Sequence, residues 1–222
     1  MKIAVIGGTG PQGRGLAYRL ALAGHEVLIG SRDASRAADK AAEIAEAVRQ
    51  TGLDTVSVDG DENLAAAGNA ENVLLAVPYD GHDELVASLA PALSGKIVVS
   101  CVNPLGFDEK GPYALDVADG SAAEEGQRLV PDARFVGAFH HVSAVNLWKH
   151  KGPLAEEDVL VCGDDDDANN IVADLAKAVT GHRGVIAGGL RLARELEPLT
   201  GVLISINKRH KVRSGVRIIG LD

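Results

Sequence analysis

The sequence predicts an α/β protein built on a doubly wound parallel sheet that helices cover on both faces. Short runs that are apolar throughout, such as residues 2–7 and 72–77, alternate with stretches of helical period. Strands without polar alternation are those buried on both faces, as parallel sheets require. Glycine supplies 26 of the 222 residues, well above the usual ~7%. The length suits one such domain with a modest appendage.

The first half of the chain repeats a strand-helix unit. Residues 2–7 (KIAVIG) predict a strand, residues 12–23 a helix and residues 26–30 (EVLIG) a second strand. A β-α-β unit of this length is expected to pair its two strands in parallel. The pattern continues with helices over residues 34–50, 63–67 and 83–93 and strands over residues 55–58, 72–77 and 96–101.

The second half is less regular. Residues 105–120 are rich in glycine and acids and predict a loop, and a long loop is expected over 139–157. Residues 190–207 have a helical pattern interrupted by Pro198 and Gly201. The remaining elements are a helix over 122–129, a strand over 134–138, the last sheet strand over 159–162 and a helix over 168–179.

This pattern divides the chain into two parts. Residues 1–162 form the sheet domain, and residues 163–222 are too few for an independent domain. We expect them to form a small, mostly helical cap on the carboxyl edge of the sheet. Four aspartates, residues 164–167, precede the helix expected at 168. They suggest a metal site, but consecutive acids also stabilise the positive end of a helix, so we expect no metal.

Composition narrows the possible partners. With 22 basic and 31 acidic residues the net charge is −9, which repels nucleic acid and anionic membranes. No apolar run approaches the ~18 residues of a membrane span, and the glycine-rich start does not resemble a signal peptide. Cys101 and Cys162 each end an apolar run, which predicts two buried thiols in a reducing compartment. We expect a cytoplasmic protein that binds neither nucleic acid nor membrane.

A glycine motif follows the first predicted strand and opens the first predicted helix. Gly8 permits the tight turn, Gly10 leaves room for a pyrophosphate near the backbone, and Gly13 lets helix and strand pack closely. The helix N-terminus then faces the anion. This context favours a Rossmann-type dinucleotide site over a merely tight turn. The motif residues are Gly8, Thr9, Gly10, Pro11, Gln12 and Gly13.

The end of the second strand indicates which dinucleotide binds. A carboxylate there would hold the ribose diol of NAD, but the chain has Ser31 and Arg32, with Arg36 one turn further on. A hydroxyl and two guanidinium groups suit a 2′-phosphate. The sequence therefore favours NADP over NAD. The alternative is that Arg32 and Arg36 are ordinary surface charges of a helix. Asp33, beside them, can serve as an N-terminal helix charge.

Other strand ends place further residues at the same edge. Val77 and Pro78 follow one strand and could pack against a nicotinamide, although simple strand termination explains them equally well. His140 and His141 follow the strand expected over 134–138. Adjacent histidines rarely chelate one ion, and no zinc-like spacing lies nearby. We interpret His140 as a wall of the substrate pocket, with an ordinary buried histidine as the alternative.

Several catalytic schemes lack their signatures. No tyrosine is followed by a lysine four residues later, and neither G-x-S-x-G nor G-x-x-x-x-G-K-[ST] occurs. Reduction of a carbonyl usually needs a proton donor. A substrate that accepts only a hydride into its own ring system would explain why acids and bases are scarce.

The combined motifs resemble those of the NADPH-dependent reductases of the 8-hydroxy-5-deazaflavin coenzyme F420. The resemblance extends over nearly the whole chain. It rests on GGTG at 7–10, GSR at 30–32, KIVVS at 96–100, VCGDDD at 161–166 and Leu199-Thr200, among other matches.

The resemblance implies hydride transfer between NADPH and the deazaflavin on a 1–162 NADP-binding domain, with the 163–222 cap contributing to the deazaflavin pocket. Thr9 to Gln12, Ser31, Arg32 and Arg36 would hold the phosphate groups of NADP. Val77, Pro78, Tyr79 and Ala144 would border the nicotinamide. His140, Arg194 and Thr200 would surround the deazaflavin, with His140 positioning the rings and no acid or base assigned.

The basic C-terminal segment and the quaternary structure allow alternatives. Residues 208–222 carry five basic groups against one acid, and we expect Arg213 and Arg217 there to attract the deazaflavin's anionic tail. A solvated terminus is the other interpretation. The family often forms homodimers. The apolar residues of the last helix suit either an interface or an intrachain contact, namely Val202, Leu203, Ile204 and Ile206.

Two rival functions also fit the sequence. An NADP-dependent reductase of a small imine or carbonyl could use the same scaffold, because a fold does not settle its substrate. A non-catalytic NADP sensor could carry the same glycine turn.

Overall fold

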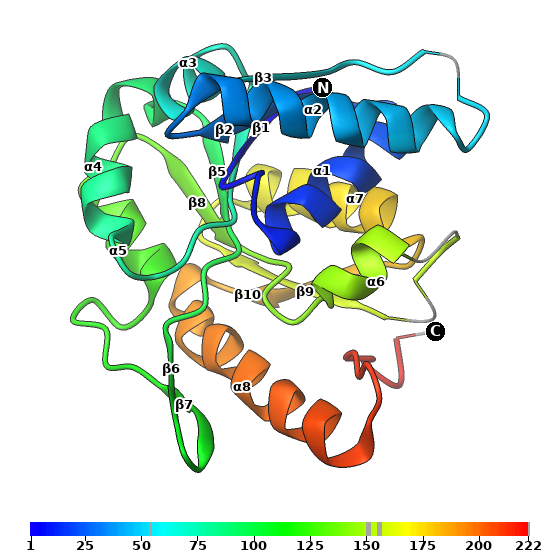
Figure 1. Cartoon of the computed structure of the whole chain (residues 1–222). Coiled ribbons are helices and arrows are strands. Elements are labelled where there is room, and N and C mark those ends of the chain that lie inside the picture. Colours follow the sequence, from blue (N-terminus) through cyan, green and yellow to red (C-terminus); the bar gives the residue numbers. More distant parts are fainter. Residues whose placement is uncertain (54, 150–151, 155–156, 222) are drawn as a thin grey trace.

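The computed structural model describes residues 1–53, 55–149, 152–154 and 157–221. Within them an eight-stranded sheet has the order β10-β9-β8-β5-β4-β1-β2-β3, with helices on both faces (Figure 1). The expected doubly wound α/β fold is confirmed. The sheet strands are β1 (Lys2–Ile6), β2 (Glu26–Ser31), β3 (Val58–Glu62), β4 (Asn72–Leu75), β5 (Ile97–Ser100), β8 (Arg134–Gly137), β9 (Val159–Gly163) and β10 (Gly184–Gly188).

The strand order contains a switch point beside β1. From β1 the chain proceeds outward through β2 and β3, and then returns to place β4 on the other side of β1. The ends of the two inner strands are adjacent, because Ile6 of β1 pairs with Leu75 of β4 in parallel. Crevices in open α/β sheets form at such points, outside the carboxyl ends of the strands.

Two cores lie on opposite faces of the sheet. Along β1, Ile3 and Val5 contribute to one core, and Ala4 and Ile6 contribute to the other. The first core is covered by α1 (Pro11–Leu22), α2 (Ala34–Arg49), α6 (Ala144–Lys149) and α7 (Asp166–Thr180). The second is covered by α3 (Asn63–Gly68), α4 (His82–Leu93), α5 (Ala122–Leu129), the short turn η1 (Leu190–Leu192) and the start of α8 (Ala193–His210).

The sheet is mixed rather than wholly parallel, and residues 159–162 do not form its last strand. β9 pairs antiparallel with β8, and β10 extends the sheet beyond β9 in parallel. The sequence of β10, GVIAG, is half exposed and ends in glycine. An edge strand of this kind pairs through its backbone and needs no apolar run. Gly184 also lies so close to α7 that a Cβ there would be 2.5 Å from Ala173 Cα.

The other edge strand also differs from the prediction. β3 covers Val58–Glu62, not residues 55–58, and its sequence VDGDE is mostly exposed. It pairs with β2 along its whole length. A Cβ on Gly60 would lie 2.3 Å from the backbone carbon of Ala37 in α2, so glycine allows the helix to cover this strand. Polar residues therefore form a strand where the apolar pattern predicted none.

Both predicted loops contain regular structure. Residues 105–120 include an antiparallel hairpin, β6 (Leu105–Asp108) and β7 (Gly111–Ala114). The loop expected over 139–157 contains α6, and its positions 150–151 and 155–156 lie outside the described residues. Arg19 of α1 fixes this segment, because its guanidinium donates to Leu147 O at 2.8 Å and Gly152 O at 2.6 Å. These distant contacts have no local signature.

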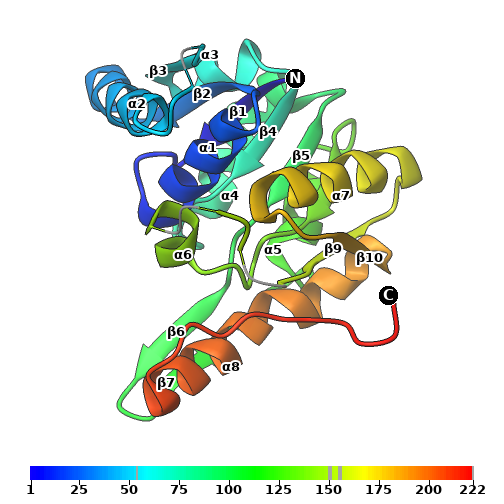
Figure 2. The same cartoon turned by 90° about the vertical axis from the view of Figure 1, so that its right-hand side faces the viewer.

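The last helix is continuous, so the interruption predicted at Pro198 and Gly201 was wrong. Pro198 lies inside α8. Gly201 is buried against the hairpin, where a Cβ would lie 3.4 Å from Leu105 and 3.6 Å from Pro112. Gly201 thus packs against the hairpin within the continuous helix and does not end it. Figure 2 shows α8 leaving the sheet with the C-terminal segment running back alongside it.

α8 and the segment after it follow the last strand of the sheet. Within residues 163–222, α7 and β10 belong to the layers of the sheet. The division of the chain at residue 162 stays a prediction.

Among the described residues, the helices are too short or too polar to cross a membrane.

Candidate active site

A glycine turn connects β1 to α1. The backbone N–H of Gly8 donates to Val5 O at 3.1 Å, and that of Gly10 donates to Gly7 O at 2.9 Å. The left-handed residue is Gly7, with φ of +80°, one position before the motif begins. A Cβ on Gly13 would lie 2.5 Å from Gly7 O. This contact explains why glycine is needed where the helix crosses the turn.

The N-terminus of α1 faces a cavity of about 450 Å³. In the described chain no side chain caps this helix, whose first turn contains no acid. Free N–H groups at a helix start are a general site for anions. The cavity is lined mainly by the glycine turn and by the ends of β2 and β4, with Gly7, Thr9, Gly10, Ser31, Arg32, Arg36, Asn63, Val77 and Pro78 among its residues.

The cationic rim of this first cavity lies at the end of β2. Arg32 and Arg36 are exposed and line the cavity together with Ser31. Asp33 does not neutralise the rim by pairing with Arg32, because its Oδ1 caps α2 by accepting from Arg36 N at 3.1 Å and from Ser35 Oγ at 2.9 Å. The bond from the Arg36 backbone is the main reason that the pKa of Asp33 is lowered.

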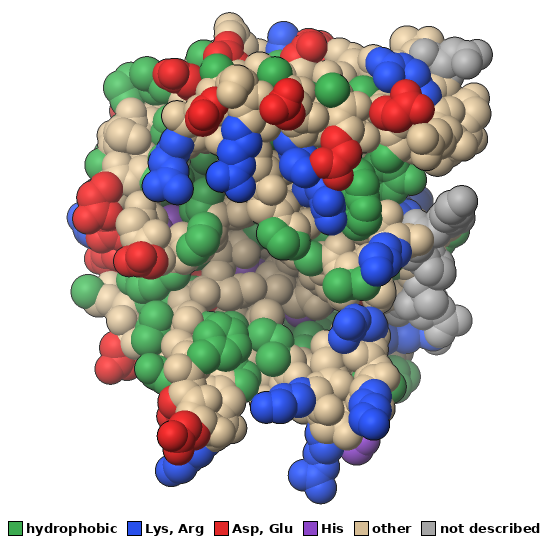
Figure 3. All heavy atoms as spheres, viewed as in Figure 1, with side chains coloured by type: hydrophobic (Ala, Val, Ile, Leu, Met, Phe, Trp, Pro, Cys, Tyr) green, Lys and Arg blue, Asp and Glu red, His purple; other side chains and the backbone are tan. Residues whose placement is uncertain are grey.

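A second cavity of about 610 Å³ adjoins the first. Both are lined by Gly10, Val77 and Pro78, so the two cavities meet there. Figure 3 shows the hollow across the middle of the molecule, with Lys and Arg side chains on both sides. The further lining of the second cavity comes from α1, α6, α8, the segments after β5 and β8, and the C-terminal segment. It includes Pro11, Gln12, Cys101, Asn103, His140, His141, Ala144, Thr200, Asn207, Arg213 and Ser214.

His140 forms a neutral wall of the second cavity. Its side chain is buried, and its ring lies beside the backbone of Val102. Burial, with a smaller contribution from His141, lowers the pKa of His140 to about 3. The ring is therefore uncharged near neutral pH, which makes it unsuited to donating a proton.

The backbone around His140 is held from three directions. Its carbonyl accepts from Thr200 Oγ1 at 2.7 Å and from Asn103 Nδ2 at 3.1 Å. The preceding residue, Phe139, has a φ of 62°, which is strained for a bulky side chain. Gln12 Nε2 donates to Phe139 O at 3.3 Å. The positive φ of Phe139 has no signal in the sequence.

Residues that line this cavity also carry buried polar atoms without a hydrogen-bond partner. Among the described residues, these atoms are Asn103 Oδ1 and Ser214 Oγ, whereas His141 Nδ1 lies 3.7 Å from Glu157 Oε1. Buried polar atoms are normally satisfied, so these two are available to hydrogen-bond an occupant of the cavity. Sequence reasoning did not select Asn207 or Ser214 as site residues, because the path of the last segment is not visible in the sequence.

Three predicted residues lie elsewhere. Arg194 forms an ion pair with Glu124 at 2.5 Å and lines neither cavity. Arg217 is exposed on the C-terminal segment and also lines neither. Tyr79 lines a neighbouring hollow of about 720 Å³ that extends toward the hairpin and includes Thr200. Arg213, which we also expect to attract the deazaflavin's anionic tail, lines the second cavity.

Comparison with known proteins finds relatives over the whole chain. Residues 2–104 match the family described as NADP oxidoreductase coenzyme F420-dependent. The F420-dependent NADP reductase of Methanothermobacter marburgensis is 39% identical, with 100% of this chain and 99% of that protein covered. The protein of the same name from Methanocaldococcus jannaschii is 37% identical, with 100% of both chains covered.

A solved structure extends the likeness to three dimensions. It is a candidate F420-dependent NADP reductase from Arthrobacter sp. FB24, 32% identical, with a TM-score of 0.81 and coverage of 98% of this chain and 99% of that one. Sequence and fold therefore agree over the full length, and the chain belongs to the F420-dependent NADP reductase family.

Proposed function

We propose that this protein transfers a hydride directly between NADPH and the deazaflavin coenzyme F420. The observation that carries the proposal is the pair of cavities that meet at Gly10, Val77 and Pro78. One has the features of a phosphate site, and the other is a mostly apolar space with polar groups on its wall, large enough for a ring system. Relatives named as F420-dependent NADP reductases cover the whole chain.

The first cavity would hold NADP. Thr9 and Gly10 line this cavity beside the uncapped start of α1, whose first N–H groups would face the pyrophosphate. Ser31, Arg32 and Arg36 offer a hydroxyl and two guanidinium groups to the 2′-phosphate. When bound, the nicotinamide ring supplies or accepts the hydride. Val77 and Pro78 border the junction at which that ring would meet the second cavity.

The second cavity would hold the deazaflavin. His140 contributes a flat, uncharged surface, and Thr200 and Asn103 fix the backbone beneath it. Ala144 lines the same cavity near the glycine turn. The protein's contribution is to position two rings and exclude water, and positioning can supply ~7–11 kcal/mol of a barrier. Arg213 is placed to attract the anionic tail of the deazaflavin.

We also propose that the protein is a cytoplasmic homodimer. Both cysteines are buried free thiols, which suits a reducing compartment. Leu203 is buried within the chain, but Val202 and Ile206 of α8 are exposed, as are Phe107 and Tyr113 of the hairpin. Exposed apolar residues in such number suit a self-association surface.

Sedimentation equilibrium should give twice the 23.0 kDa chain mass. The monomer mass at micromolar concentration would contradict the dimer.

The proposed reaction is tested by mixing the protein with NADPH and oxidised F420. We expect the visible absorption of the deazaflavin to fall as NADPH is consumed. No change above background, together with turnover of a small imine or carbonyl, would favour the rival reductase. Binding of NADP without turnover of any acceptor would favour a sensor.

Arg32→Glu tests the choice of dinucleotide. The substitution places a carboxylate against the 2′-phosphate, so we expect NADP affinity to fall by about 10- to 100-fold, with NAD affinity kept or raised. Calorimetric titration measures both. Arg49→Glu, at the far end of α2, is the matched control and should leave both affinities unchanged. Equal affinities for NADP and NAD before and after the change would show that Arg32 does not bind the 2′-phosphate.

His140 should remain neutral throughout the working pH range. The pKa of its imidazole is about 3 in the folded protein, against an ordinary value of 6.5 in the unfolded chain. Since the unfolded state then binds more protons between these values, His140 lowers the free energy of unfolding as pH falls below 6.5 and has no effect above it.

Histidine NMR signals at several pH values measure the pKa of His140. Urea unfolding at the same pH values measures its effect on the free energy of unfolding. His140→Asn should flatten the pH dependence of stability, whereas His210→Asn, at the exposed end of α8, should leave it unchanged. An imidazole midpoint near 6.5 for His140 would refute the expectation.

A further inference from the structure

The C-terminal tail, residues 211–221, has no helix or strand of its own. It begins where Lys211 adopts a φ of 56° and reverses the chain at the end of α8. The tail then runs back beside the molecule (Figure 2). A segment without regular structure depends on other groups to hold its backbone.

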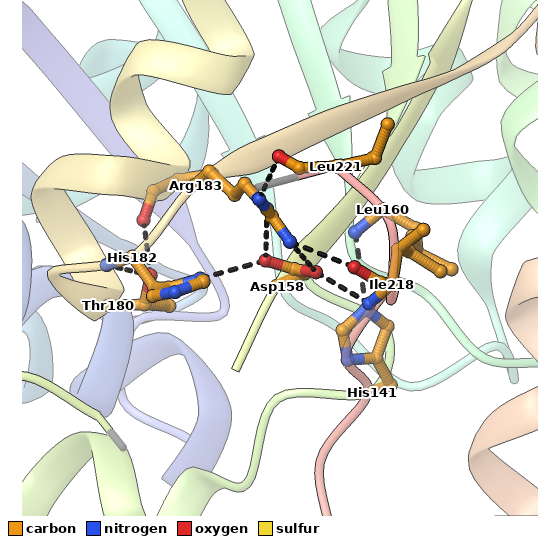
Figure 4. Close-up of polar contacts among 9 residues, drawn as sticks. His141, Asp158, Leu160, Thr180, His182, Arg183, Ile218 and Leu221 are labelled. Carbon is orange, nitrogen blue, oxygen red and sulfur yellow. Dashed lines mark hydrogen bonds and ion pairs between the residues drawn. The ribbon is translucent and has the colours of Figure 1, made fainter. Parts of the chain in front are cut away.

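Asp158 supplies the main attachment of the tail. Its buried carboxylate accepts from the backbone N–H of Ile218 at 2.7 Å, and its own N–H donates to Val216 O at 2.8 Å. The same carboxylate accepts from His182 Nδ1 at 2.8 Å and from Arg183 Nε at 2.9 Å. Figure 4 shows Ile218, His182 and Arg183 around the Asp158 carboxylate, with their bonds to it as dashed lines.

Arg183 completes the attachment. Its guanidinium holds Asp158 and also donates to Ile218 O at 2.9 Å and to Leu221 O at 2.5 Å. Burial by itself would raise the pKa of Asp158, but the bonds from Ile218, Arg183 and His182 outweigh burial and lower it. The carboxylate is therefore ionised at neutral pH. We call Asp158 and Arg183 the tail clamp.

The direction of the last two strands explains why the clamp lies near the site. Asp158 directly precedes β9, and Arg183 directly precedes β10. Because β9 and β10 run opposite to β8, their starts lie at the edge where the other strands end. That edge carries both cavities. His141, which lines the second cavity, accepts from Leu160 N in β9 at 3.3 Å, so cavity and clamp are neighbours.

The other end of the tail forms part of the cavity wall. Arg213 and Ser214 line the second cavity. Ser214 N donates to Asn207 Oδ1 at 2.6 Å, whereas Ser214 Oγ is buried and has no partner in the described part of the chain. Gly215 is pressed against Glu157, and a Cβ there would lie 2.8 Å from the Glu157 carboxyl carbon. The short stretch between Ser214 and Val216 therefore links the wall directly to the clamp.

We propose that Asp158 is a positioning residue for the deazaflavin coenzyme: by clamping the tail, it holds Arg213 and Ser214 in place against the occupant of the second cavity. This inference rests on the proposed function. Asp158 itself lines neither cavity. The tail is largely exposed, with Ile219 at 90%, so its release uncovers little of the core.

Asp158→Asn tests the proposal, because it keeps the size of the side chain and removes its charge. We expect the KM for F420 to rise by about tenfold, with kcat at saturating F420 and the affinity for NADP unchanged. Asp165→Asn is the matched control. Asp165 also bonds a backbone N–H, that of Ala168 at 2.7 Å, but at the start of α7. It should leave the KM for F420 unchanged.

A chain ending at Lys211 separates positioning from general stability. This truncation should raise the KM for F420 as Asp158→Asn does, and adding Asp158→Asn to it should raise the KM no further, because the substitution acts only through the tail. If the Asp158→Asn protein does not fold, the truncated chain still tests the proposal. A KM for F420 equal to that of the full chain would then overturn it.

The outcomes distinguish this inference from the function on which it rests. An active wild-type protein whose KM for F420 is unaffected by Asp158→Asn overturns the positioning role alone. Additive effects of truncation and Asp158→Asn also overturn it, because they show that Asp158 acts independently of the tail. A wild-type protein that does not react with F420 overturns the proposed function and the positioning role together.

Discussion

The close approach of α1 to the turn after β1 is the constraint on which the site depends. A Cβ on Gly13 would lie 2.5 Å from Gly7 O, and one on Gly8 would lie 2.8 Å from Val5 O. Glycine at both positions lets the helix begin directly at the edge of the sheet, with its N–H groups toward the first cavity. Because β1 lies at the switch point, the same edge brings Arg32 and Val77 to that cavity.

The second cavity is assembled from segments far apart in the chain. The carbonyl of His140, after β8, is bonded by Asn103, after β5, and by Thr200 of α8. These contacts hold the backbone in a turn that Phe139 would otherwise resist. The result is a buried, uncharged imidazole beside unpartnered polar atoms. Such a surface suits positioning of a ring rather than proton transfer.

Local features were predicted better than long-range contacts. The position of Asp33 predicts a charge at a helix start, and Asp33 caps α2. The family resemblance places Arg194 at the deazaflavin, and this role stays a prediction; in the structure Arg194 pairs with Glu124, and Arg213 lines the second cavity. Polar VDGDE and glycine-rich GVIAG both form edge strands, which pair through the backbone. The sequence around Gly201 predicts a helix break, because it does not show that this residue packs against the hairpin.

By itself the sequence determined the order of most strands and helices, the glycine turn and the cationic end of β2. These features depend on groups within a few residues of one another. Tertiary structure alone decided the reversal of β9 and β10, the second cavity and the tail clamp. The bonds that form them, Thr200 to His140 and Ile218 to Asp158, each span 60 residues. Only the folded chain brings such partners together, so no local pattern reports them.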